Sequence, residues 1–202
     1  MRKHFHLLVL LLFLFPGCRS EPGVVAINHG TIKKVKISKP LTLLVEEFAD
    51  LRDKPAYIGA KQDGFGTNTG YIALEEGSVA KMLTAYFASA MSLNGYKIIT
   101  EHPGKNIANH YDAVVRAEII NFWFSTYLNA SHSIKVRFFV LSPENGEVLW
   151  EKIIEAQNKE KLEWDTDFET INYREIIDKT TTDFLNSAVR EFASAKIAAN
   201  KK

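Results

Sequence analysis

The chain has 202 residues, of which 46% are hydrophobic, and this is enough for one domain with its own core. It carries 25 Lys and Arg residues against 24 Asp and Glu residues, so no excess of charge points to nucleic acid or to an anionic surface as partner. The single cysteine, Cys18, excludes an intramolecular disulfide bond and any metal site that needs several cysteines.

The N-terminus has the pattern of a signal peptide, which we place at residues 1–17. A basic segment precedes nine consecutive large apolar residues, Leu7–Phe15. This run is about half of the roughly 20 residues that cross a hydrocarbon core, so it predicts a signal-peptide core rather than a transmembrane helix.

Cys18 follows this apolar run directly, after the small residue Gly17. The pair resembles the lipobox of bacterial lipoproteins, although Phe15 and Pro16 depart from the usual leucine and small residue at these positions. The resemblance implies that Cys18 is acylated, for example with palmitate, and becomes the first residue of the mature chain. The alternative is a soluble secreted protein with one stray cysteine.

The remaining elements follow in chain order. Residues 18–40 are predicted as a lipid-bearing tether, and residues 41–197 as a single globular domain. Apolar residues predict a strand at Leu41–Val45, and a long loop follows from Ala49 to Glu76.

Two segments have the apolar spacing of amphipathic helices, and a group of strands lies between them. The first helix is expected at 78–94, capped by Ser78 at its start and by Asn94-Gly95 at its end. Further elements are predicted at 96–100 (short strand), 113–124, 133–141 and 147–156 (antiparallel meander) and from 173 onward (second helix). We therefore predict an α+β fold, in which two amphipathic helices pack on one face of a mostly antiparallel sheet.

One candidate site is a cluster of acidic residues that could bind a cation or transfer protons: Glu46, Glu47, Asp50 and Asp53. Its densest part is Asp50-Leu51-Arg52-Asp53. The competing interpretation is a hydrogen-bonded Asp/Arg network that closes the loop after the first strand. We favour the network.

Gly64 and Gly66 belong to a G-x-G segment that lacks the strand-to-helix context of a nucleotide site, so they predict a turn that needs positive φ. Ser78-Val79-Ala80-Lys81 matches the S-x-x-K motif of penicillin-recognising enzymes, but the K-T-G motif is absent and Ser78 is already explained as a helix cap. The histidines have no metal-binding spacing. We expect no catalytic residue, no metal site and no cofactor.

The order of elements resembles the YajG-type family of uncharacterised bacterial envelope lipoproteins. The motifs that carry this resemblance are Asp50-x-Arg52, Ile58-Gly59, Gly95-Tyr96 and Asn145-Gly146. The resemblance implies a lipoprotein of the outer membrane that faces the periplasm and has no established chemistry, and it assigns a role only to Cys18.

These observations predict a non-enzymatic envelope lipoprotein, held to the membrane by its lipid and binding a protein partner in transport or assembly. The alternative is a soluble secreted enzyme or small-molecule-binding module that uses the Asp50–Gly70 loop. The residues of this candidate ligand or structural loop are Asp50, Arg52, Asp53, Gly59, Gly64 and Gly66.

Overall fold

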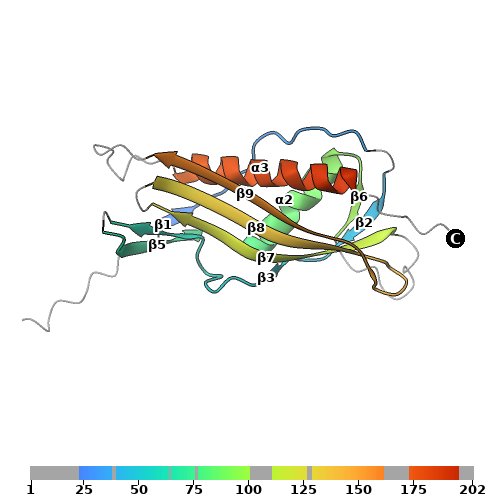
Figure 1. Cartoon of the computed structure of the whole chain (residues 1–202), viewed down its shortest axis with the longest axis horizontal. Coiled ribbons are helices and arrows are strands. Elements are labelled where there is room, and N and C mark those ends of the chain that lie inside the picture. The colour runs from blue at the N-terminus through green and yellow to red at the C-terminus, as the bar shows by residue number, and fades with distance from the viewer. Residues whose placement is uncertain are drawn as a thin grey trace, which may run out of the picture.

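The computed structural model describes residues 23–37, 40–63, 65–75, 77–100, 111–126, 129–161 and 173–195, which form a nine-stranded sheet and two helices (Figure 1). The elements are β1 (Gly23–Val25), β2 (Thr42–Val45), β3 (Ala49–Asp50), β4 (Gly59–Gln62), β5 (Asn68–Leu74), α2 (Val79–Leu93), β6 (Lys97–Ile99), β7 (Ala113–Ser125), β8 (Asn129–Leu141), β9 (Val148–Lys161) and α3 (Tyr173–Ser194). The predicted α+β fold is confirmed.

The three long strands β7, β8 and β9 form the antiparallel meander that the sequence predicts. The other edge of β7 pairs in succession with β2, β3 and β4, all of them parallel to it. The sheet is therefore mixed. Parallel neighbours need a long crossover, and α2 supplies one between the parallel strands β2 and β6.

Both helices cover the same face of the sheet, as predicted (Figure 1). Alternate residues of β8 point into the core, where the ring of Phe138 lies 5.1 Å from that of Phe87 on α2 and 5.6 Å from that of Phe192 on α3. The opposite face carries ion pairs, among them Lys135 with Glu155 (2.5 Å). A sheet with one packed face and one solvated face produces this alternation.

A β-bulge interrupts the alternation in β7. The register shifts between Ile119 and Asn121, so the buried positions change from odd-numbered residues such as Ile119 to even-numbered residues such as Phe122. An extra residue in one strand reverses the face that the following side chains point to. The shift keeps both halves of β7 packed against the helices.

The long loop predicted from Ala49 to Glu76 is wrong, since β3, β4 and β5 lie within it. β4 and β5 form an antiparallel hairpin, and β4 also pairs with the end of β7. These strands are short and rich in glycine and polar residues, so their sequence has little of the apolar alternation that predicts a strand.

The tether predicted for 18–40 also needs correction, because residues 23–37 pack along the domain. β1 pairs with β5, and Ile27 and Ile32 are buried. Three side chains one turn apart on α3 accept backbone N–H groups of this segment: Asp178 from Asn28 (2.8 Å), Thr182 from Gly30 (2.7 Å) and Asn186 from Lys33 (2.7 Å). Cys18, the predicted signal peptide and the end of the chain lie outside the described residues.

Candidate functional site

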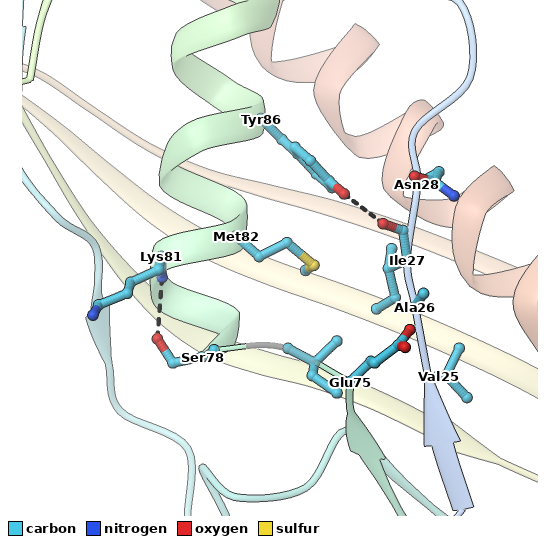
Figure 2. Close-up of a pocket in the computed structure, with 11 residues that line it drawn as sticks. Val25, Ala26, Ile27, Asn28, Glu75, Ser78, Lys81, Met82 and Tyr86 are labelled. Atoms are coloured by element: carbon cyan, nitrogen blue, oxygen red, sulfur yellow. Dashed lines mark hydrogen bonds between the residues drawn. The ribbon is translucent and has the colours of Figure 1, made fainter.

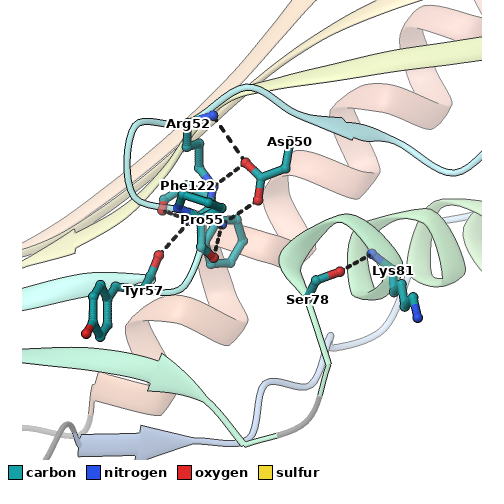
Figure 3. Close-up of polar contacts among 7 residues, drawn as sticks. All are labelled: Asp50, Arg52, Pro55, Tyr57, Ser78, Lys81 and Phe122. Atoms are coloured by element: carbon teal, nitrogen blue, oxygen red, sulfur yellow. Dashed lines mark hydrogen bonds and ion pairs between the residues drawn. The ribbon is translucent and has the colours of Figure 1, made fainter.

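Arg52 and Asp50 form a largely buried ion pair at the end of β3 (Figure 3). Nε and Nη2 of Arg52 donate to the two carboxylate oxygens of Asp50 at 2.8 and 2.7 Å. The two side chains are only 5% and 13% exposed. A guanidinium group matches a carboxylate in this two-bond geometry, which makes the contact strong and directional.

The same guanidinium group also donates to three backbone carbonyls. Its partners are Tyr57 (2.8 Å), Phe122 (3.1 Å) and Pro55 (3.0 Å). β3 stops pairing with β7 at Ile119 and β4 starts at Phe124, so Arg52 occupies the gap between these two strands. Arg52 supplies the hydrogen-bond donor that the backbone of a strand would have supplied there. The predicted Asp/Arg network is therefore the arrangement that the structure shows.

The other acidic residues of the predicted cluster do not converge on a cation site. Glu46 pairs with Arg116 (2.5 Å) across the exposed face of the sheet, and this pairing raises the pKa of Arg116. Asp53 lines a hollow of about 290 Å³ beside the Arg52 network, together with Trp123. Among the residues that the structure describes, no three His, Cys, Asp or Glu side chains gather in a way that could hold a metal ion.

The glycines of the candidate loop have steric and conformational roles. A Cβ on Gly59 would lie 2.5 Å from the carbonyl oxygen of Phe124, so only glycine lets β4 approach β7 this closely. Gly66 has a φ of 81°, which confirms the predicted positive-φ turn at this position. Gly64 lies outside the described residues.

Ser78 caps α2, as predicted (Figure 3). Its Oγ accepts the backbone N–H of Lys81 at 3.2 Å, while the Lys81 ammonium group points away from it. A nucleophilic serine needs a base within hydrogen-bond reach of its oxygen. The S-x-x-K match is thus a helix cap, and Asn94 closes the other end of the helix.

A hollow of about 650 Å³ lies between the N-terminal segment and the start of α2 (Figure 2). Its wall includes Ile27, Glu75 and Met82. The Tyr86 hydroxyl donates to the Ile27 carbonyl (2.5 Å), and burial raises the pKa of this tyrosine. Sequence reasoning missed this hollow, because residues before Gly30 and after Leu74 meet there only in the folded chain.

His132 is a histidine of the core rather than a ligand. Its ring is buried edge-on against Phe122, with 4.6 Å between ring centres, and neither ring nitrogen has a hydrogen-bond partner among the described residues. Burial lowers the pKa of His132 to about 3, so the ring is neutral at physiological pH. Of the other histidines, His29 contacts Tyr86, and His102 and His110 lie outside the described residues.

No protein-family model and no curated protein matches the chain. Solved structures do share its fold. A Xanthomonas campestris protein of the DUF330 family has a TM-score of 0.59 at 12% sequence identity, covering 86% of this chain and 94% of that one. A hypothetical protein from Chlamydia trachomatis has a TM-score of 0.52 at 13% identity, covering 79% and 99%.

A further uncharacterized protein matches with a TM-score of 0.52 at 10% identity, covering 85% of this chain and 99% of that one. Identities this low show a common fold and transfer no activity. The expectation of a fold shared with uncharacterised proteins is met, and membership of the YajG-type family stays a prediction.

Neither described helix combines the length and the apolar character that a membrane-spanning helix needs.

Proposed function

We propose that this chain is a bacterial envelope lipoprotein, anchored through acyl groups on Cys18, whose folded domain is a non-enzymatic binding or accessory module. The observation that carries the proposal is the position of the only cysteine, directly after an apolar signal-like run and Gly17. One acyl chain binds a membrane marginally and two or more bind it stably. A lipoprotein cysteine with several chains would hold the domain permanently at the membrane.

Two contacts of the folded domain support the non-enzymatic part of the proposal. The residues that the sequence suggested as catalytic candidates make internal contacts: Asp50 with Arg52, and Ser78 with the backbone of Lys81. Groups held in this way position the backbone and are not presented to a substrate. For the binding role, we propose a protein partner in envelope transport or assembly.

The outer membrane is the proposed location, with the domain facing the periplasm. The residue after Cys18 is Arg19. An aspartate at that position often retains bacterial lipoproteins at the inner membrane, so its absence favours the outer one. Density-gradient separation of the two membranes from cells that make the protein tests this assignment.

Metabolic labelling tests the anchor itself. Cells making the full chain are grown with an alkyne-bearing fatty acid, and the purified protein is coupled to a fluorescent azide. We expect label on the native chain and on the control Ser20→Ala, and none on Cys18→Ala. An unlabelled native chain, or label that persists in Cys18→Ala, would falsify the proposal.

A further inference from the structure

The distance between the lipid-bearing position and the domain is short. Gly23 already pairs with Ile72 of β5, and the segment that follows is held on α3 by Asp178, Thr182 and Asn186. Only five residue steps separate Cys18 from Gly23. Fully extended, they span about 16–18 Å at most.

The direction of β1 tells which part of the domain faces the anchor. β1 runs parallel to β5, and β5 starts at the tip of the β4–β5 hairpin. The chain before Gly23 therefore enters from the side of the hairpin tip. From the level of Ile72 to the tip is roughly 16–20 Å at the rise of a β-strand, so the reach of Cys18 matches the projection of the hairpin.

Phe65 stands at this tip and is 94% exposed. Single exposed apolar side chains are common on protein surfaces, and exposure alone would mean little. What distinguishes Phe65 is its place, at the tip of a hairpin that lies within reach of the anchor. The aromatic ring is of a kind that partitions into the interfacial region of a bilayer.

Several N–H groups of the turn that carries Phe65 are paired within the turn. Oδ1 of Asp63 accepts N–H groups from Phe65 (2.9 Å) and Thr67 (2.8 Å), and the Asp63 N–H donates to the Thr67 carbonyl (3.0 Å). Backbone groups that enter an apolar environment must be paired within the protein. The N–H groups of Asp63, Phe65 and Thr67 would therefore not enter the bilayer unpaired.

We propose that the tip of the β4–β5 hairpin, with Phe65 at its apex, lies in the interfacial region of the bilayer to which Cys18 anchors the chain. The inference rests on the proposed function and adds the orientation of the domain to it. The β8–β9 turn then points away from the membrane, because Val114 pairs with the end of β8 and Phe124 with Gly59, ten residues further along β7. Ten residues correspond to about 33 Å of strand.

Site-directed fluorescence tests this orientation on the full lipidated chain. Acylation through a thioether blocks Cys18, so Phe65→Cys introduces the one free thiol for an environment-sensitive NBD probe. The labelled protein is reconstituted into phosphatidylcholine vesicles that contain lipids with a nitroxide near the head group. Val148→Cys, 56% exposed and at the other end of the sheet, is the matched control.

We expect a blue-shifted probe at position 65 that is quenched at least threefold more strongly than the same probe at position 148. Equal quenching at both positions on lipidated protein overturns the orientation and leaves the proposed function standing. Mass spectrometry of the same sample decides the other case, since a Cys18 without lipid contradicts the proposed function and the orientation with it. Shielding of position 65 only when envelope proteins are added would assign the tip to a protein partner and would overturn the inference.

Discussion

The guanidinium group of Arg52 donates a hydrogen bond of 3.1 Å to the backbone carbonyl of Phe122, a residue 70 positions further along the chain. The contact falls where the edge of β7 opposite β8 has no strand partner, between the end of β3 and the start of β4. A side chain thus completes the edge of the central strand, and Asp50 fixes its orientation.

We predict that Arg52→Met lowers the free energy of unfolding by about 3–5 kcal/mol, because it leaves the Asp50 carboxylate buried without its partner and three carbonyls without a donor. Urea unfolding followed by circular dichroism measures the loss. Arg116→Met is the matched control, since Arg116 is 59% exposed in its pair with Glu46 and its loss costs below about 1 kcal/mol. Equal costs for the two variants would contradict the role of Arg52.

Gly59→Ala is expected to destabilise the protein by about 1–3 kcal/mol, since the added Cβ would overlap the Phe124 backbone and push β4 away from β7. Gly23→Ala in β1 is the control. Its Cβ would meet nothing closer than the Lys61 side chain at 3.8 Å, so the change stays within about 0.5 kcal/mol. Thermal unfolding of both variants measures the difference, and a harmless Gly59→Ala would show that the close approach of β4 to β7 does not require glycine.

We predict that burial of His132 makes the free energy of unfolding fall in acid. The folded chain keeps this ring neutral, with a pKa of about 3, whereas the unfolded chain has the ordinary value of 6.5. Below pH 6.5 the unfolded state therefore binds a proton that the folded state binds only near pH 3. The free energy of unfolding falls by up to about 1.4 kcal/mol per pH unit in this window, and His132 makes no such contribution above it.

We expect His132→Phe to remove this contribution and to preserve stability at pH 7, because both unpaired ring nitrogens are replaced by apolar atoms. Unfolding at pH 7, 6, 5 and 4 measures the slope of native and variant protein. His132→Leu serves as a second variant, in case the larger ring of phenylalanine strains the core. The prediction fails if native and variant proteins lose stability equally between pH 6.5 and 4.

Ser78→Ala is predicted to lower the free energy of unfolding by about 1 kcal/mol through loss of the α2 cap. Lys81→Ala should change it by less than about 0.5 kcal/mol, since only the Lys81 backbone takes part in the contact. A fluorescent penicillin tests the catalytic interpretation of the S-x-x-K match. If the fluorescent penicillin labels the native chain covalently and does not label Ser78→Ala, Ser78 is more than a helix cap.

Local sequence patterns predicted much of this fold, and the reason is that their causes are local. The alternation in β8 and the spacing of apolar residues in α2 each follow from neighbours a few positions apart. The same holds for the Ser78 cap, which depends on a residue three positions away. The favoured Asp50–Arg52 contact was also predictable, because its two members are two residues apart.

The missed elements depend on partners far away in the sequence. β4 is recognisable as a strand only beside β7, and the segment at 28–33 is ordered by three side chains of α3 about 150 positions later. Nothing in the sequence around Arg52 indicated that it would reach Phe122.

The sequence by itself determined the meander, the two amphipathic helices and the position of the only cysteine after an apolar run. Only the tertiary structure decided that the segment from Gly23 onward packs with the domain, that Arg52 fills the open edge of β7, and that Phe65 is presented on the side from which the chain enters. The physical reason is the same for all three. Hydrogen bonds between segments that lie far apart in the sequence, rather than local side-chain periodicity, place these residues.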